Sequence, residues 1–237
     1  MYTVTLLMTI FVSSFILAFV ISYFIVKNED KLKYGKLHDK KLTIALFINR
    51  SKLAIKNFIL ISILTTISMY AIGDNFFVFE KIAVWKFAFL FFVMIALDDV
   101  WFYFIHRMMH TNKYLYKKIH SVHHTTIPPI PLDYLFVHPL EALVGSIGLI
   151  IGVLFLFLID GNINFYVVAA YSLYRALHEI AIHSGFQIIP KKYLGFIGGA
   201  KHHFNHHKFH NGNYASAFTY LDKLFGTEVK VRGKVID

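Results

Sequence analysis

The chain has 237 residues, of which 57% are hydrophobic and 17% aromatic, and its mean hydropathy is +0.55. This apolar share is well above that of an ordinary soluble domain and indicates a membrane protein. The formal net charge of +10 could point to nucleic acid, but the basic residues lie between hydrophobic runs rather than in one stripe, so we expect no nucleic-acid partner. The chain has no cysteine, which excludes disulfides, thiolate metal sites and cysteine nucleophiles.

The first apolar run covers residues 2–26 and contains no charged side chain. No basic segment precedes it and no small-residue cleavage signature ends it, so we expect a retained transmembrane helix rather than a signal peptide. A basic loop follows, which the positive-inside rule places in the cytoplasm. Its basic residues are Lys27, Lys31, Lys33, Lys36, Lys40, Lys41, Arg50, Lys52 and Lys56.

Four further runs, 57–72, 82–105, 140–159 and 165–182, continue this alternation and return the chain to the same side. The sequence therefore predicts an all-α polytopic membrane protein with about five hydrophobic helices and a His-rich cytoplasmic helical cap. Several runs are shorter than the roughly 20 residues of a perpendicular crossing, so one hairpin could be re-entrant. Glycines at helical spacing, Gly145, Gly148 and Gly152, favour close packing of two membrane helices.

Thirteen of the 14 histidines lie between His106 and His210, at the predicted cytoplasmic helix ends and in the segments joining them. Residues three and four apart on a helix share one face, so each set below can approach one metal ion. Eight such imidazoles exceed what one tetrahedral zinc needs and predict two ions. They are His106 and His110 of "HRMMH", His120, His123 and His124 of "HSVHH", and His203, His206 and His207 of "HFNHH". The isolated His38 is expected to be structural.

The segment "HEIAIH" looks like a zinc-protease motif but is not one. Its histidines, His178 and His183, are five residues apart rather than four and diverge by about 140° on a helix. Spacing does not choose the metal, because zinc binds most nitrogen sites more tightly than ferrous iron. A nitrogen-ligand site at a membrane surface favours oxygen activation against a lipid carbon–hydrogen bond, which zinc cannot perform because it has no redox chemistry.

Six segments resemble, in order and spacing, the membrane-bound fatty acid hydroxylase and sterol desaturase superfamily between Leu97 and Thr227. They are "DDVWFYFIHRMMH", "LYKKIHSVHH", "HPLEAL", "IHSGF", "KHHFNHH" and "NGNYASAFTYLDKLFGT". Within the superfamily, "HSGF" and "GNYAS" most resemble the 4-methyl sterol oxidases and related sterol hydroxylases. The resemblance divides the chain into residues 1–96, with N-terminal membrane helices and a cytoplasmic loop, and a catalytic domain over residues 97–237 that includes the second membrane hairpin and the cap.

The resemblance implies a non-haem di-iron monooxygenase that uses molecular oxygen, although purified protein could contain zinc instead of iron. The implied metal ligands are His106, His110, His120, His123, His124, His183, His203, His206 and His207. Asp99 precedes the first ligand by seven positions and is expected to orient His106 as a hydrogen-bond acceptor. His138, His178 and His202 are further supporting residues or possible ligands, and the role of His210 is left open.

The expected reaction is hydroxylation or desaturation of a lipid, with a sterol or related lipid preferred and a fatty acyl chain or carotenoid as the alternative. A separate reductase or cytochrome must supply electrons, because the chain shows neither a dinucleotide-binding fingerprint nor a haem or flavin domain. The host membrane would be the endoplasmic reticulum in a eukaryote and the inner membrane in a bacterium. The competing class is a non-enzymatic metal-binding membrane protein or transporter, which we disfavour because the histidines lie at helix ends on one side.

Overall fold

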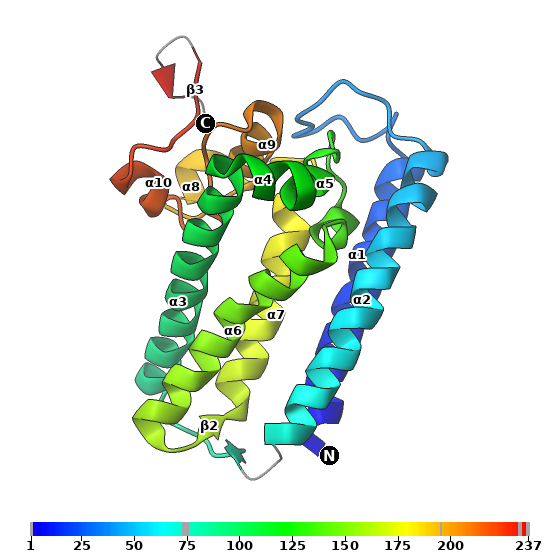
Figure 1. Ribbon diagram of the computed structural model, residues 1–237. Helices are drawn as coiled ribbons and strands as arrows, with labels where there is room; N and C mark the ends of the chain where they lie inside the picture. The colour runs from blue at the N-terminus through cyan, green and yellow to red at the C-terminus, as the bar shows by residue number, and fades with distance from the viewer. Residues whose placement is uncertain (1, 73–75, 195, 232–233, 236–237) are drawn as a thin grey trace.

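A computed structural model describes residues 2–72, 76–194, 196–231 and 234–235, so residues 73–75, between the predicted runs 57–72 and 82–105, lie outside the described part. The long helices form a bundle, and short helices form a cap at one end (Figure 1). The long helices are α1 (Tyr2–Lys27), α2 (Ile44–Ile72), α3 (Val84–Thr111), α6 (Pro139–Asp160) and α7 (Phe165–Ile182). This arrangement confirms the predicted all-α polytopic class.

Short elements complete the chain. In the cap they are α4 (Lys113–Leu115), the π-helix η2 (Tyr116–His120), α5 (Ser121–His124), the 3-10 helix η3 (Pro131–Leu135), α8 (Lys191–Leu194), α9 (Ala200–Phe209) and α10 (Tyr220–Leu224). Strands β1 (Phe77–Val78) and β2 (Ile163–Asn164) pair in parallel at the opposite end, and β3 (Lys230–Val231) pairs antiparallel with β4 (Lys234–Val235).

Among the described residues, α1, α2, α3 and α6 are long and apolar enough to cross a membrane by length and composition. The predicted fifth segment forms α7, which lies within the same bundle but is less apolar because it carries Arg175 and Glu179. The loop of residues 28–43 lies at the capped end, where Gln187 N–H donates to Gly35 O (2.7 Å). The basic loop and the His-rich cap are therefore on the same side, as the charge pattern predicts.

The boundaries of α6 and α7 follow from local sequence signals. His138 caps α6 by accepting a hydrogen bond from Leu140 N–H (3.2 Å), and Pro139 follows at the first helical position, where a missing N–H costs nothing. Gly161 ends α6 in the left-handed conformation with φ 68°. Asn164 then caps α7 by accepting from Val167 N–H (3.3 Å).

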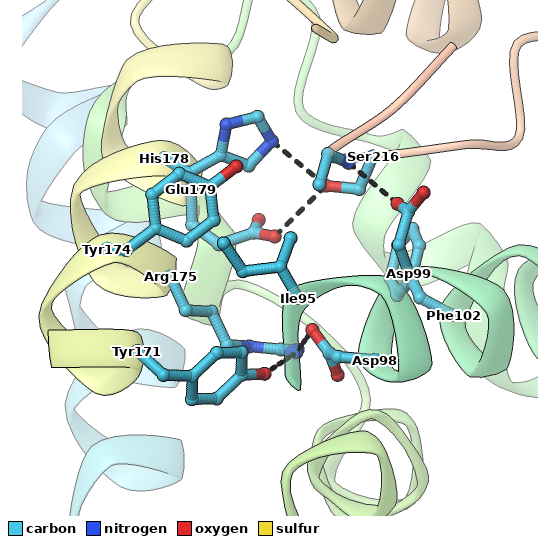
Figure 2. A pocket seen from close by; sticks show the side chains of 11 residues that line it. Ile95, Asp98, Asp99, Phe102, Tyr171, Tyr174, Arg175, His178, Glu179 and Ser216 are labelled. Atoms are coloured by element: carbon cyan, nitrogen blue, oxygen red, sulfur yellow. Dashed lines mark hydrogen bonds and ion pairs between the residues drawn. The ribbon is translucent and has the colours of Figure 1, made fainter. Parts of the chain in front are cut away.

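Close packing of α3 on α6 depends on two of the three predicted glycines. A Cβ on Gly148 would lie 1.9 Å from Asp98 Oδ1, and one on Gly152 would lie 3.2 Å from Met94 Cε, whereas one on Gly145 would meet nothing within 4 Å. Asp98 also pairs with Arg175 of α7 (Figure 2). The interface thus joins α3, α6 and α7, and Gly145 is free for another role.

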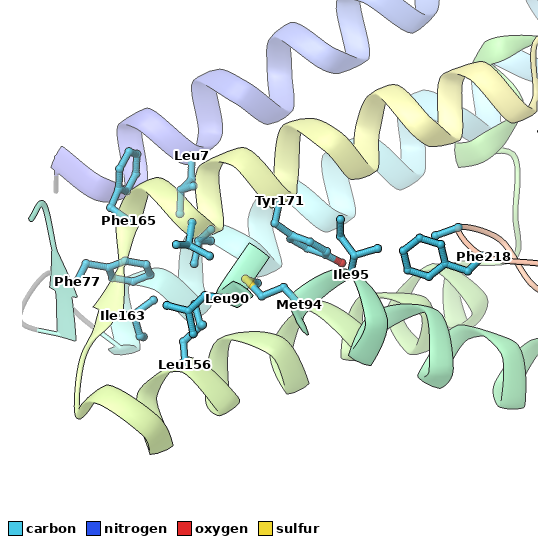
Figure 3. Packing of buried hydrophobic residues seen from close by; sticks show 13 residues of the cluster. Leu7, Phe77, Leu90, Met94, Ile95, Leu156, Ile163, Phe165, Tyr171 and Phe218 are labelled. Atoms are coloured by element: carbon cyan, nitrogen blue, oxygen red, sulfur yellow. The ribbon is translucent and has the colours of Figure 1, made fainter. Parts of the chain in front are cut away.

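The apolar core extends from the end opposite the cap toward the bundle centre (Figure 3). Leu90 and Met94 of α3 pack there with Leu156 of α6 and Tyr171 of α7, and all four side chains are fully buried. Nearer the cap, a second cluster joins α1 and α2 to η3, where Arg50 pairs with Asp133 (2.6 Å) and donates to Pro128 O (2.8 Å). The Arg50–Asp133 ion pair is therefore buried beside an apolar cluster near the cap.

Candidate metal centre

Nine histidines converge under the cap in two groups. Site A contains five, contributed by α3, η2, α5 and α9, and site B contains four, contributed by α5, the end of α7 and α9. Site A consists of His106, His110, His120, His124 and His206, and site B consists of His123, His183, His203 and His207. Within each group the candidate ligand atoms all lie within 4.8 Å of one another. Every histidine that the resemblance implies as a ligand is in one of the two sites.

Each three-histidine motif divides its side chains between the sites. His120 and His124, four apart, belong to site A, and His123 between them belongs to site B. The second motif does the reverse, since His203 and His207 belong to site B and His206 belongs to site A. The helices α5 and α9 therefore each contribute histidines to both sites.

Hydrogen bonds at Nδ1 fix the orientation of five of the nine rings. His106 Nδ1 donates to Tyr214 O (2.7 Å), His206 Nδ1 to Gly212 O (2.8 Å), and His183 Nδ1 to Glu179 O (2.9 Å). The two remaining donors of this kind are His123 to Phe136 O (3.3 Å) and His120 to the Glu141 carboxylate (2.7 Å). A carbonyl or carboxylate oxygen accepts only, so the proton is on Nδ1 and Nε2 presents a lone pair to the site.

These lone pairs face each other at short range. His106 and His120 Nε2 atoms are 3.1 Å apart in site A, and His123 and His183 Nε2 atoms are 3.4 Å apart in site B. Two lone pairs at that distance repel unless a cation lies between them, since neither nitrogen has a proton to donate. Burial and the neighbouring imidazoles lower the pKa of His203, His206 and His207 well below the usual 6.5, which keeps these rings neutral as metal ligands must be. The residues present therefore fit two metal cations.

The nitrogen separations also limit the coordination geometry. Two nitrogens about 2.1 Å from one ion lie about 3.0 Å apart at a right angle and about 3.4 Å apart at the tetrahedral angle. In site A, His110 Nε2 lies 2.9 Å from His120 Nε2 and 3.0 Å from His124 Nε2, and His206 Nε2 lies 3.1 Å from His124 Nε2. Five ligands at right-angle spacing suit a metal of higher coordination number and not one tetrahedral zinc.

A cavity of about 270 Å³ leads from the metal centre into the bundle. The end of the cavity nearest the cap, its inner end, is formed by histidines of both sites. Its walls come mainly from apolar side chains of α1, α2, α6 and α7. On α6 the lining runs from Glu141 to Val153, about 18 Å at 1.5 Å per residue. Gly145 lines this cavity. The geometry can hold an elongated apolar molecule with one end beside the two sites.

A polar cluster lies between α3, α7 and the tail segment that follows α9 (Figure 2). Ser216 Oγ donates to Glu179 Oε1 (3.3 Å) and lies 3.3 Å from His178 Nε2. The other carboxylate oxygen of Glu179 is 3.6 Å from His183 Nδ1. Ser216 thus connects the tail to the helix end that carries a site B histidine.

The four supporting residues lie outside both histidine sites. The predicted hydrogen bond from His106 to Asp99 is wrong, because His106 Nδ1 donates to Tyr214 O. Asp99 instead accepts from Ala217 N–H (2.8 Å) and Phe218 N–H (3.3 Å). His138 caps α6, His178 contacts Ser216, and His202 Nε2 donates to Asp222 Oδ2 (3.1 Å). Asp222 also accepts from Tyr214 N–H (2.9 Å), so these residues mainly hold the tail against the centre.

Sequence reasoning missed two carboxylates and one aromatic pair beside the centre. Glu141 of "HPLEAL" and Glu179 of "HEIAIH" contact ligand rings, and the only available signal was an acidic residue within a His-containing motif. Tyr116 and His210 are hydrogen-bonded (2.5 Å), and the ring of His210 lies 4.4 Å from that of His124. No spacing rule relates Tyr116 to His210, because they are 94 residues apart.

Comparison with known proteins gives a consistent family. The model of the family described as fatty acid hydroxylase matches residues 91–227. Methylsterol monooxygenase 1 of Rattus norvegicus is 41% identical over 137 residues, which cover 57% of this chain and 45% of the rat protein. Methylsterol monooxygenase erg25A of Aspergillus fumigatus is 36% identical over 137 residues, which cover 57% of this chain and 45% of the fungal one.

A plant protein with a different name is similar to the same degree. A very-long-chain aldehyde decarbonylase of Oryza sativa subsp. indica is 36% identical over 142 residues, which cover 58% of this chain and 51% of the rice protein. The chain therefore spans about half the length of the curated relatives it matches. No solved structure matches the chain.

Proposed function

Because the chain belongs to the fatty acid hydroxylase family, we propose that it is a membrane-bound oxygenase that inserts oxygen into, or desaturates, a lipid carbon–hydrogen bond. The single observation that carries this proposal is the pair of histidine sites at the inner end of an apolar cavity. A metal centre alone would serve many functions. A metal centre at the end of an apolar cavity between the long helices supports a lipid substrate.

Two irons are the proposed metals, one in site A and one in site B. Bound there, they supply oxygen activation and the redox chemistry that zinc lacks. Glu141 accepts the Nδ1 proton of His120 and thereby keeps Nε2 of that ring available as a ligand. Tyr214 O and Gly212 O do the same for His106 and His206, so the tail after α9 orients two site A ligands.

The cavity determines what reaches the metals. Its apolar walls bind the hydrocarbon body of the lipid and exclude water, while the rings of His106 and His183 stand beside the carbon to be oxidised. A sterol or related lipid is the preferred substrate because the rat and fungal relatives are named methylsterol monooxygenases. A long acyl or carotenoid chain is the alternative, and the rice relative's name refers to a long-chain aldehyde.

Topology and partners complete the proposal. The capped end is the cytoplasmic side, since the basic loop of residues 28–43 lies there. The proposed division at residues 96 and 97 falls within α3: the first part contributes α1 and α2 to the cavity wall, and the second contributes the histidines and the rest of the wall. Reducing equivalents come from a separate protein.

A transporter or metal sensor is the competing class. A transport path needs ligands distributed along the membrane depth. Over the part of the chain that the structure describes, the groups of three or more possible ligands are sites A and B alone, and both lie under the cap. This placement favours the oxygenase.

The test is a comparison of lipid products. Wild type, His206→Ala and the matched control His38→Gln are expressed in a host supplied with sterols, fatty acids, carotenoids and a compatible reductase, and total lipid extracts are analysed by mass spectrometry. His38 lies outside both sites, where its Nδ1 donates to Lys40 O (2.9 Å). We expect a product that gains one oxygen or loses two hydrogens in wild type and control only.

Each outcome has a defined meaning. The class of the modified lipid decides between the sterol and the acyl or carotenoid alternatives. Extracts of wild type and His206→Ala that do not differ, with iron loading and reductase activity verified, would refute the oxygenase proposal.

A further inference from the structure

We infer that electrons enter the metal centre at site A, through the hydrogen-bonded pair Tyr116–His210, from an acidic one-electron carrier protein that docks on the basic surface around this pair. The inference rests on the proposed function. A monooxygenase turnover combines O₂, one C–H bond, two electrons and two protons to give C–OH and water. Two molecules of reduced carrier each lose one electron per turnover, so the carrier must approach the centre repeatedly.

Site A is the metal site nearer to solvent. Of the nine histidines His110 alone is not fully buried, and its ring lies 5.5 Å from the ring of Tyr116. Tyr116 and His210 are themselves partly exposed. The ring of His210 then lies 4.4 Å from the ring of His124. Electron tunnelling falls steeply with distance, so this pair offers a short path from the surface to two site A ligands.

The backbone conformation at the end of α9 places the His210 ring close to site A. His210 ends α9 in the left-handed region, with φ 63°, which few residues other than glycine adopt. The turn holds the imidazole between Tyr116 and His124. Such conformations persist only where surrounding contacts hold them, and the Tyr116 hydroxyl at 2.5 Å from His210 Nδ1 is one such contact.

The two segments that carry the pair are basic. Residues 100–132 and 180–221 contain no aspartate or glutamate. We define the carrier patch as Tyr116, His210 and three of the four exposed lysines within three residues of one of them, Lys113, Lys117 and Lys208; the fourth is Lys118. A positive surface of this kind attracts an acidic partner and raises its association rate.

A carrier protein fits the patch better than anionic lipid does. Figure 1 shows α4 and α9 in the cap, at the end of α3. A lipid headgroup would provide no electrons, whereas the aromatic pair at the middle of the patch leads to the metal ligands.

The test uses the full-length iron-loaded enzyme in nanodiscs, with an acidic [2Fe–2S] ferredoxin and its reductase as the probe. The triple variant Lys113→Glu/Lys117→Glu/Lys208→Glu is compared with the matched control Lys33→Glu/Lys40→Glu/Lys41→Glu, whose exposed lysines lie in the loop at the same end. Active enzyme is counted by the product of a single turnover after anaerobic dithionite reduction and an oxygen pulse.

We expect the KM for ferredoxin to rise about tenfold or more in the patch variant and less than about twofold in the control, because charge reversal replaces attraction by repulsion. The salt dependence of kcat/KM should weaken or reverse only in the patch variant. Equal KM values in the two variants would overturn the inference. So would an effect seen in phosphatidylserine nanodiscs but absent in phosphatidylcholine nanodiscs, which would assign the patch to anionic lipid.

A second measurement addresses the path. Tyr116→Leu removes the aromatic ring, and Tyr116→Phe keeps it, so stopped-flow reduction at saturating ferredoxin should slow about tenfold in the first variant and less in the second. Reduction rates that match wild type in both variants would overturn the assignment of Tyr116. A wild-type enzyme that gives no single-turnover product would instead refute the proposed function, so the two failures are distinguishable.

Discussion

Replacing Gly148 by alanine should destabilise the bundle, while the same change at Gly145, three residues earlier on α6, should not. The new Cβ at residue 148 would lie 1.9 Å from Asp98 Oδ1 and 3.2 Å from the Asp98 backbone Cα. Asp98 cannot rotate freely, since its other oxygen is paired with Arg175. Either the α3–α6 interface opens or the carboxylate leaves Arg175.

The expected magnitude follows from these alternatives. Overpacking costs about 1–3 kcal/mol. The pair with Arg175, whose side chain is 27% exposed, adds about 1 kcal/mol when it is broken. Alanine returns up to about 1 kcal/mol through helix propensity. The net loss is about 2 kcal/mol, which corresponds to a midpoint lower by roughly 4–8 °C for a chain of this size.

The assay is thermal unfolding of purified protein in one detergent at one heating rate. Gly145→Ala meets nothing within 4 Å, so its midpoint should equal or slightly exceed that of wild type. If Gly148→Ala unfolds at the same temperature as Gly145→Ala, then the close contact between α3 and α6 does not constrain this bundle and the reasoning is refuted.

Three further outcomes are expected. His206→Ala should lose metal from site A and His207→Ala from site B, each leaving about one iron per chain by elemental analysis, whereas two irons retained in either would contradict the assignment. Burial lowers the pKa of His123 and His207 below the unfolded value of 6.5, so the unfolded chain binds more protons than the folded chain as the pH falls. The metal-free protein should therefore unfold at a lower temperature at about pH 5.5 than at about pH 7.5, and equal unfolding midpoints would refute this prediction. Asp222→Asn should weaken the tail by about 1–3 kcal/mol, seen as faster proteolysis after α9, because its carboxylate accepts from two backbone amides and Thr227 Oγ1 (2.7 Å).

The sequence predicts which histidines come together, but it does not predict how they are divided between site A and site B. Offsets of three and four place His120, His123 and His124 on one helical face, and all three reach the centre. Sites A and B lie on either side of that face, so the neighbouring helices decide whether a ring joins site A or site B. The π-helical turn that ends at His120 contributes to this geometry and has no clear sequence signal.

Long-range contacts explain the main error. Asp99 precedes His106 by two helical turns, which favours a direct contact on α3 alone. The tail inserts Tyr214 O at His106 and presents Ala217 N–H to Asp99, more than 100 residues away in sequence. A backbone amide or carbonyl from a distant loop has no side-chain pattern, so such partners are invisible to spacing rules.

The position of the metal centre at the end of the bundle follows from the same hydrogen bonds. Inside a helix a backbone carbonyl already accepts one N–H of the helix, whereas carbonyls beyond a helix end are free to accept from an imidazole. The acceptors for His106, His123 and His206 are the carbonyls of Tyr214, Phe136 and Gly212, all outside the long helices, and the acceptor for His183 is a carbonyl in the last turn of α7. Four of the nine imidazoles are therefore oriented at or beyond a helix end, and under the proposed function the cavity between the helices is the path by which a lipid reaches them.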